Sequence, residues 1–316
     1  MHNRYLLWLR FDGSHFNGFA KAGGKGYGVI DFLYPALSRV LAHKNVDRFN
    51  VFPCSRTDTD VHVLRAPVVL NVPKDVVRLD IDRESLLQEI NTTFQTFYPN
   101  SVEALDFHWV SPGFCARKHA IYRRYIYRFR VARTMEWYTQ FEKTPSLACF
   151  SERFYALTVP SGFDIAKSNK ACEMLMGTHN VASFLKHPLR VRGTEWQGVM
   201  RNIDLIRIVS GEPITGIEDP HFEYFNFEVI SKSFVREQIR RMVRIIVKCG
   251  YEDRYIDHLR IMLRCPDPAT FIQLGHRASN GKGLYLVDVV YDKDHFENPV
   301  PFYKHPIDRI DESSLL

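Results

Sequence analysis

The chain has 316 residues, a length that suits one large domain or two of ordinary size, and two is the working expectation. Its 45% hydrophobic and 25% charged residues argue against a disordered chain, and no apolar run approaches the roughly 20 residues of a membrane-spanning helix. The formal net charge of +6 at pH 7 is compatible with a polyanionic partner, but so modest an excess is weak evidence by itself.

Cysteine and histidine usage excludes two further classes of protein. The six cysteines include no C-x-x-C pair, and most of them lie in apolar patterns, which is typical of reduced core thiols rather than of a disulfide framework or a zinc site. No two histidines have metal-ligand spacing, so we expect no metal. A strand-like pattern begins directly after residue 4 and leaves no room for a signal peptide. We therefore expect an intracellular protein, either cytoplasmic or mitochondrial.

Periodic hydrophobic patterns in the first third of the chain predict a strand, a helix, two strands, a helix and a strand. The predicted ranges are 5–11, 29–43, 49–52, 67–72, 83–94 and 102–110. Pro35 lies inside the first helix and predicts a kink, and Asp82 or Asp80 is expected to cap the second. The glycine-rich stretch 12–28 lacks the spacing of a nucleotide-binding fingerprint. This order of elements is typical of a ferredoxin-like half.

The rest of the chain has a similar pattern. Predicted strands cover 122–133, 200–209, 221–231 and 283–291, and predicted helices cover 165–176, 235–250 and 253–264. Residues 133–151 show no period and are interpreted as an irregular connection. We therefore expect an α+β fold of two ferredoxin-like halves, 1–111 and 112–316. Their strands are expected to form one mixed, mostly antiparallel sheet with helices on one face.

A short polar run, residues 54–62, separates two of the predicted strands in the first half. A polar loop mounted on a rigid sheet is a common place for catalytic side chains. The alternative is an ordinary turn, in which Ser, Thr and Asp bond to nearby backbone amides. The residues of this run alone favour the ordinary turn.

Basic residues gather in two other stretches. Within 114–128, six basic residues alternate with aromatic ones, a combination that suits phosphate contacts and base stacking, although a solvated sheet edge can also look like this. Arg236, Arg240 and Arg244 lie four residues apart on one face of a predicted helix. Such a row is most often a solvated surface, but it can also pair with a carboxylate or follow phosphates. The first stretch favours a nucleic-acid partner.

Five stretches together resemble the tRNA pseudouridine synthases of the TruA type, and most closely their animal pseudouridylate synthase-like branch. Residues 56–62 match the family pattern Arg-Thr-Asp-x-Gly-Val-His except at Asp60. The other matching positions are Phe114, Ala116, Arg117, Arg123 or Arg124 and Tyr125; 177–180 with Ser183 and Phe184; Ser233, Phe234, Ile239, Arg240 and Met242; and 283–286. The likeness spans nearly the whole chain.

The resemblance implies a role for several residues. Asp58 is implied to be the catalytic aspartate, with Arg240 paired to it. Tyr125 is implied to pack against the target uracil, and Leu284 to line the pocket. The other candidate substrate-binding residues are Arg56, His62, Arg117 and Arg124.

The chemistry of the implied reaction agrees with these residue types. Forming pseudouridine breaks the bond between the base and its sugar, turns the base and rejoins it through carbon 5. This rearrangement needs a carboxylate or nucleophile but no redox or metal cofactor. An opposite charge keeps a carboxylate ionised, and Arg240 is the candidate for that task. A paired base must be flipped out and stacked, and Tyr125 is the candidate aromatic face.

We therefore expect an isomerase that converts uridine to pseudouridine in RNA, most plausibly in tRNA near the anticodon stem-loop. Its RNA-binding cleft is expected on the sheet face opposite the helices, with the active site between the halves. Asp60 and Arg244 each replace a glycine of the family pattern, and aspartate is among the few residues that tolerate a positive φ. The alternative is a non-catalytic RNA-binding protein or tRNA chaperone on the same scaffold. Whether the chain forms a homodimer is left open.

Overall fold

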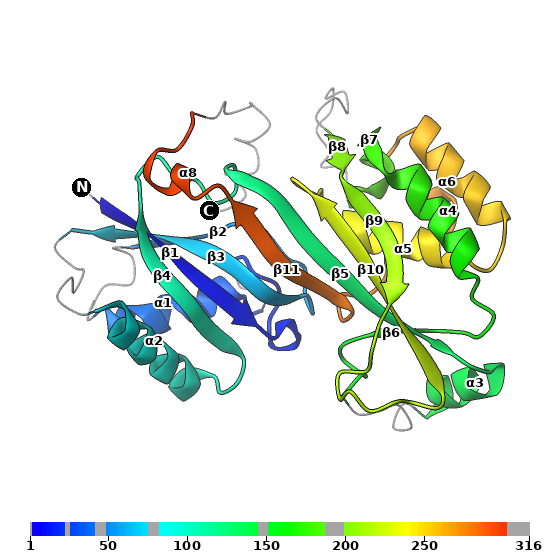
Figure 1. Ribbon diagram of the computed structural model, residues 1–316, viewed down its shortest axis with the longest axis horizontal. Helices are drawn as coiled ribbons and strands as arrows, with labels where there is room; N and C mark the ends of the chain where they lie inside the picture. Colours follow the sequence, from blue (N-terminus) through cyan, green and yellow to red (C-terminus); the bar gives the residue numbers. More distant parts are fainter. Residues whose placement is uncertain are drawn as a thin grey trace. The chain divides into compact units, whose positions relative to one another are not determined.

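The computed structural model describes residues 2–22, 26–41, 49–74, 82–144, 151–186 and 199–301. The chain forms two compact units, drawn in Figure 1. Unit 1 contains Met1–Tyr122 and Leu286–Leu316, and unit 2 contains Arg123–Tyr285. The halves predicted from the sequence, 1–111 and 112–316, stay a prediction, because a compact unit need not be a domain that folds by itself.

The sheet of unit 1 has the strand order β4-β1-β3-β11, in which β11 is Leu284–Tyr291; β1 is antiparallel to both β3 and β4, and β2 also pairs antiparallel with β3. The strands are β1 (His2–Phe11), β2 (Asn50–Pro53), β3 (His62–Pro73) and β4 (Val102–Val110). Helix α1 (Val29–Val40) follows β1, and helix α2 (Arg83–Phe97) follows β3. This is the ferredoxin-like arrangement that the sequence predicts.

The two helices of unit 1 lie on the same face of its sheet (Figure 1). The rings of Phe32 in α1 and Phe94 in α2 are 5.2 Å apart and join the helices. Asp82 caps α2 by accepting hydrogen bonds from the backbone N–H groups of Glu84 and Ser85, as predicted. Pro35 lies inside α1, which continues to Val40.

Unit 1 also contains most of β11 (Leu284–Tyr291) and the short helix α8 (Asp294–Glu297). Phe114, from the segment after β4, packs edge-on against the rings of Tyr291 and Phe296 at 5.5 and 5.2 Å. Tyr291 in turn meets Trp8 of β1 at 5.9 Å. These aromatic contacts attach the end of the chain's described part to the first strand.

Unit 2 repeats the same succession of elements with an antiparallel sheet of order β5-β10-β9. Strand β5 (Ala120–Ala132) begins in unit 1 and continues into unit 2, where it pairs with β10 (Phe222–Ser231); β9 (Leu205–Ser210) is the outer strand. A short strand, β6 (Leu157–Val159), runs parallel to β5. The α+β class and the mostly antiparallel pairing are therefore confirmed in both units.

The α-helices of unit 2 are α3 (Met135–Lys143), α4 (Ile165–Leu175), α5 (Gln238–Cys249), α6 (Arg254–Arg264) and α7 (Thr270–Gln273). A small separate sheet pairs β7 (Gly177–Asn180) with β8 (Met200–Ile203). The predicted apolar stripe of α5 is buried, and Met242, Val243 and Ile246 are fully covered. Ser168 of α4 donates a hydrogen bond to the carbonyl of Ile246 at 3.0 Å. The polar and basic stretch 186–196, which its composition predicts to be a loop, lies outside the described residues except for Lys186.

The prediction of an irregular connection after β5 is wrong at α3. Thr134 caps this helix by accepting a hydrogen bond from the N–H of Trp137, and Tyr138 and Phe141 pack against Ala132, Phe222 and Tyr224. The helix has only nine residues and none of them is buried, so its sequence lacks the buried apolar stripe that marks the longer helices.

Most of the described cysteines fit the predicted core thiols. Cys54, Cys172 and Cys249 are buried, whereas Cys265 is exposed; Cys149 lies outside the described residues. Burial raises the pKa of the Cys172 and Cys249 thiols to about 12. These two thiols are therefore uncharged and unreactive at neutral pH.

One face of α5 holds the segment 276–280, which leads into β11. Arg240 Nε donates to the carbonyl of Ser279 at 2.7 Å, and Arg244 Nε donates to that of Arg277 at 3.1 Å. Lys248 Nζ lies 3.0 Å from Nδ1 of the buried His276, whose Nε2 lies 3.0 Å from His258 Nδ1. Because an ammonium group can only donate, Nδ1 of His276 accepts, and its Nε2–H donates to His258.

We expect Phe129→Ala to destabilise unit 2 by about 3–5 kcal/mol, because it removes a buried ring and leaves a cavity. The Phe129 ring stacks on Phe227 at 4.6 Å and also meets Phe225 and Phe163 at 5.4 Å. Urea unfolding measures the change. The control Ile217→Ala, at a side chain that is 74% exposed, should stay within about 0.5 kcal/mol of wild type. Equal effects would contradict this account of the core.

His276 should make stability depend on pH. Burial, then the charges of Lys248, His258 and Arg244, lower its pKa from 6.5 to about 4. The unfolded chain therefore takes up this proton first, and stability is lost as the pH falls from about 6.5 to about 4, by at most roughly 3 kcal/mol. Urea unfolding of wild type and His276→Gln at several pH values should show their difference shrinking across this window. Parallel curves would show that His276 does not contribute.

Candidate active site

The predicted site residues are divided between the two units. Arg56, Asp58, His62 and Arg117 lie in unit 1, and Arg124, Tyr125, Arg240 and Leu284 lie in unit 2. The pairing of Asp58 with Arg240 stays a prediction. Within each unit, the local structure shows how the side chains are held.

Asp58 lies in the loop that joins β2 to β3. The N–H of Val61 donates to the carbonyl of Asp58 at 3.4 Å and closes a turn. Asp60, inside this turn, has a φ of +63°, the left-handed conformation that favours glycine. The aspartate at the family's glycine position therefore adopts the conformation for which a glycine is suited, as the sequence analysis anticipated.

The glycine-rich stretch before α1 supports the same loop. Gly18 has a φ of +99°, and a Cβ built there would lie 2.4 Å from the carbonyl oxygen of Thr57. Any larger residue would push the backbone of Thr57 and Asp58 away. The stretch thus lets two backbone segments approach closely, which the sequence alone did not reveal.

His62, the first residue of β3, holds the end of the loop in place. Its side chain is only 3% exposed. The backbone N–H of Gly13 donates to His62 Nδ1 at 3.2 Å, and the same Nδ1 lies 3.0 Å from Asp12 Oδ1. The buried ring joins the loop to residues 12 and 13, and its predicted contact with substrate stays a prediction.

The matched stretch that begins at Phe114 contributes core residues as well as exposed ones. Phe114 and Ala116 are buried, and Tyr291 donates its hydroxyl to the carbonyl of Ala116 at 2.7 Å. Arg117, directly after them, is exposed, as is Arg56 in the loop between β2 and β3. The buried members of the motif fix the backbone that presents Arg117 at the surface.

In unit 2, Tyr125 is 5% exposed and meets the ring of Phe234 edge-on at 5.3 Å. Tyr125 and Phe234 belong to two different motifs, so the fold brings these motifs together. Arg123, which alternation places on the same face of β5, is buried and donates to the carbonyl of Lys232. The sequence left Arg123 and Arg124 open for the motif, and this geometry favours Arg123.

Arg124 points to the opposite face and is bound to an acid there. Its Nε donates to Glu228 Oε1 at 2.8 Å, while Arg207 donates to Oε2 at 2.8 Å. Burial alone would raise the pKa of Glu228, but these two arginines hold it below its ordinary value. The predicted contact of Arg124 with substrate stays a prediction.

Arg240 is held by Glu237, a residue that the sequence analysis did not single out. Nη1 of Arg240 lies 3.4 Å from Glu237 Oε1, and its Nε is bonded to Ser279. Glu237 has a φ of +60° and a side chain 7% exposed, and it also binds Lys186 at 2.7 Å and Arg241 at 3.6 Å. A lone acid within the basic run 235–244 was the available signal.

The surroundings of Glu237 keep its carboxylate charged. Burial alone would raise the pKa of Glu237, but the hydrogen bond from Lys186 and the charges of Arg240 and Arg241 hold it below its ordinary value. The left-handed backbone at a residue other than glycine requires support from its surroundings, about 1–3 kcal/mol, and such residues cluster at functional sites. Glu237 therefore orients Arg240 from one side, and the Ser279 carbonyl orients it from the other.

Leu284 is buried at the start of β11. It follows a tight turn in which the N–H of Leu284 donates to the carbonyl of Gly281 at 2.8 Å. The carbonyl of Gly283 accepts a hydrogen bond from the Arg128 N–H at 2.7 Å. A Cβ at Gly283 would lie 2.5 Å from the Arg128 carbonyl and 2.9 Å from the Tyr127 ring. The glycine before Leu284 is thus required for close approach to β5.

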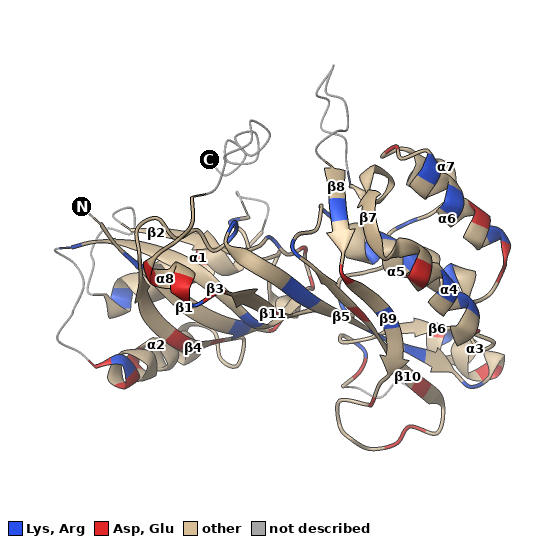
Figure 2. Cartoon of the chain, turned by 45° about the horizontal axis from the view of Figure 1, so that its top comes forward, with Lys and Arg blue, Asp and Glu red and all other residues tan. Residues whose placement is uncertain are grey.

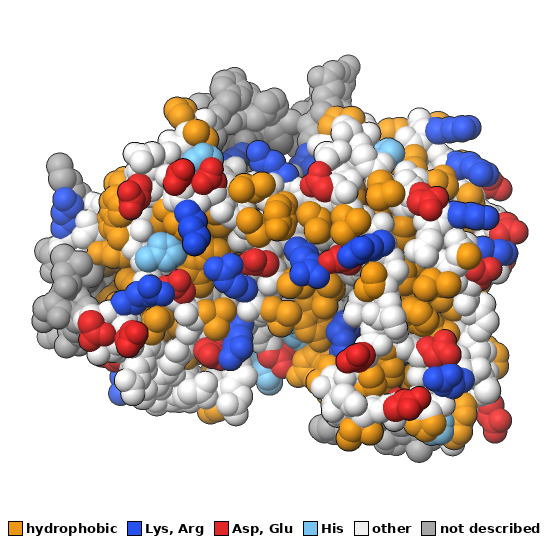
Figure 3. Space-filling view, viewed as in Figure 1, with side chains coloured by type: hydrophobic (Ala, Val, Ile, Leu, Met, Phe, Trp, Pro, Cys, Tyr) orange, Lys and Arg blue, Asp and Glu red, His pale blue; other side chains and the backbone are white. Residues whose placement is uncertain are grey.

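Basic and acidic residues lie among one another on the elements of this structure. Figure 2 shows basic residues on β5, β8 and α6, with acidic residues interspersed. On the face drawn in Figure 3, basic side chains stand singly among apolar and acidic ones. In the part of the chain that the structure describes, no three His, Cys, Asp or Glu side chains are grouped as a metal site requires, and no helix is long and apolar enough to cross a membrane.

Comparisons with known proteins agree with these motifs. A family model described as tRNA pseudouridine synthase matches residues 171–292. The protein named tRNA pseudouridine synthase-like 1 is 27% identical in Mus musculus, with 92% of this chain and 94% of that protein covered, and 28% identical in Homo sapiens, with 91% and 90% covered. The tRNA pseudouridine synthase A of Streptococcus equi is 22% identical, with 92% and 99% covered. Over most of its length the chain is therefore similar to the TruA-type tRNA pseudouridine synthases.

Proposed function

We propose that this protein converts uridine to pseudouridine in tRNA, near the anticodon stem-loop, with Asp58 as the catalytic carboxylate. The similarity to tRNA pseudouridine synthases over most of the chain supports the reaction class. The observation that carries the assignment to Asp58 is the backbone of its loop: Asp60 adopts a φ of +63°, so the departure from the family pattern leaves the turn in a glycine-like conformation.

The reaction is an isomerisation and needs no electron donor or acceptor. The bond between N1 and C1′ breaks, a bond between C5 and C1′ forms, the C5 proton leaves and N1 gains a proton. Asp58 supplies the carboxylate, whether it attacks the base or the sugar. Tyr125 offers an aromatic face for the flipped base, and Leu284 an apolar wall.

Arg240 has the task of keeping the catalytic carboxylate ionised. A guanidinium does this only if its position is fixed, because a displacement of about 1 Å can lower a rate by about 100-fold. Its bonds to Ser279 and Glu237 supply this fixation. The alternative, an RNA-binding protein without activity, would not require an arginine held in this way.

Asp58→Asn should lower the rate of pseudouridine formation by at least about 10³-fold and leave tRNA binding intact, because only the charge and basicity of one carboxylate are lost. Release of tritium from tRNA labelled at C5 of uridine measures the reaction.

Asp60→Gly is the matched control in the same turn. It should keep the activity, because glycine adopts the observed φ without strain. If Asp58→Asn forms pseudouridine at the wild-type rate, Asp58 is not the catalytic group. If the wild-type protein binds tRNA but forms no pseudouridine, the RNA-binding alternative is favoured.

Glu237→Ala should lower kcat by about 10- to 100-fold with little change in KM, because Arg240 loses the carboxylate that helps to hold it. Glu237→Gln, which keeps the shape and the acceptor oxygen, should lose less. Steady-state kinetics separate the two constants. The control is Glu223→Ala, which removes an exposed partner of Arg133 and should leave kcat unchanged. A loss confined to KM would contradict a positioning role.

A further inference from the structure

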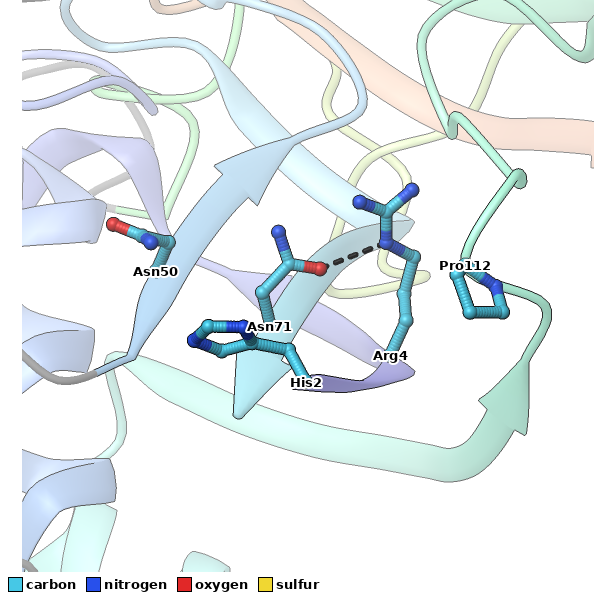
Figure 4. A pocket seen from close by; sticks show the side chains of 5 residues that line it. All are labelled: His2, Arg4, Asn50, Asn71 and Pro112. Atoms are coloured by element: carbon cyan, nitrogen blue, oxygen red, sulfur yellow. Dashed lines mark hydrogen bonds between the residues drawn. The ribbon is translucent and has the colours of Figure 1, made fainter. Parts of the chain in front are cut away.

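Unit 1 contains a polar hollow of about 260 Å³ that none of the predicted site residues lines. Its walls are His2, Arg4, Asn50, Asn71 and Pro112, drawn in Figure 4. They come from the first residues of β1 and β2, the end of β3 and the segment after β4. His62, beside the catalytic loop, and Asn71, in the hollow, are nine residues apart on β3. That separation is roughly 30 Å along an extended strand.

Arg4 is half-buried in this hollow and bonded only to neutral groups. Its Nε donates to Asn71 Oδ1 at 2.7 Å, the dashed line in Figure 4, and its Nη1 donates to the carbonyl of Phe114 at 2.7 Å. Within the described ranges, no carboxylate forms an ion pair with Arg4, and its Nη2 has no hydrogen-bond acceptor. A guanidinium taken partly out of water without an acid is an unfavourable arrangement.

Arg10, on the same strand, shows the usual arrangement. Its side chain is 56% exposed, and its Nε donates to Glu103 at 2.6 Å. Arg4, by contrast, is buried further and has neutral partners. Burial is the largest influence on its pKa and lowers it from its ordinary value, but Arg4 stays charged at neutral pH.

The other groups of the hollow are also donors or neutral. Because Oδ1 of Asn71 accepts from Arg4, its Nδ2 is available to donate, and Asn50 offers a second amide from β2. No lining residue is acidic. Arg4, Asn71 and Asn50 place donors from three strands along the lining, and a tetrahedral oxyanion offers several oxygens that can accept from them. The hollow is smaller than the roughly 300–1,000 Å³ of a pocket for a drug-sized ligand, so it suits a small group.

We propose that this hollow is a phosphate-binding site, in which Arg4 supplies the charge and Asn71 and Asn50 supply further hydrogen-bond donors. Its ligand is either inorganic phosphate or a phosphodiester of the RNA backbone. The site does not depend on the proposed reaction, since it lies at the far end of β3 from Asp58.

The first experiment uses the wild-type protein and inorganic phosphate. The ¹⁵Nε–¹H signals of Arg4 and Arg10 are both protected by hydrogen bonds and can be assigned with Arg4→Lys and Arg10→Lys. Phosphate should shift the Arg4 signal in a saturable way and leave the Arg10 signal in place. Sodium chloride and acetate at equal ionic strength should not reproduce the shift. Absence of a saturable, phosphate-specific shift overturns the proposal, whatever the result with RNA.

The second experiment decides between the two sources of phosphate. Binding of tRNA to wild type, Arg4→Met and Arg10→Met is measured from about 50 to 200 mM salt. If the site holds the RNA backbone, the slope of log K against log salt falls by about 0.7–0.9 in Arg4→Met only. An unchanged slope together with the phosphate-specific shift assigns the site to free phosphate. Neither experiment measures pseudouridine, so failure of the proposed reaction would not imitate failure of this site.

Discussion

The carboxylate of Glu237 lies among three cations at the point where α5 begins, and the geometry of this part of unit 2 depends on it. Lys186, Arg240 and Arg241 all approach it, and its own backbone is left-handed. The attraction of three positive charges stabilises a conformation that the isolated chain would disfavour. As a result α5 starts at a defined residue, and its basic face is directed toward the segment 276–280, which the helix then holds at three positions.

Unit 1 holds its candidate catalytic loop by different means. Here close backbone approach and a buried histidine replace a charge cluster: Gly18 leaves space for Thr57, and His62 contacts Asp12. In both units the candidate side chain stands on a segment whose backbone is fixed by neighbours far away in sequence. Catalysis by positioned charges requires this, because a mobile arginine or carboxylate would lose the benefit of orientation.

Much of the fold could be predicted because its strands and helices have strong periods. The ferredoxin-like order of unit 1 and the buried stripe of α5 follow from hydrophobic spacing alone. Helix α3 could not be predicted, because it buries no residue completely and its contacts with Phe222 and Tyr224 come from a distant strand. The choice between Arg123 and Arg124 likewise depends on which face of β5 each side chain lies on. Alternation along a strand assigns the faces only when the register of that strand in the sheet is known.

Short motifs are enough to identify the residue types of the candidate site and their likeness to one family, because a motif preserves the chemistry of each side chain. Contacts in three dimensions are needed to tell which of these residues are supports and which are exposed, and they add Glu237 and Arg4, which belong to none of the matched motifs. The physical reason is that partners of a charge are set by distance in space. Lys186 and Glu237 are 51 residues apart and Arg4 and Phe114 are 110 apart, so no local pattern could reveal either contact.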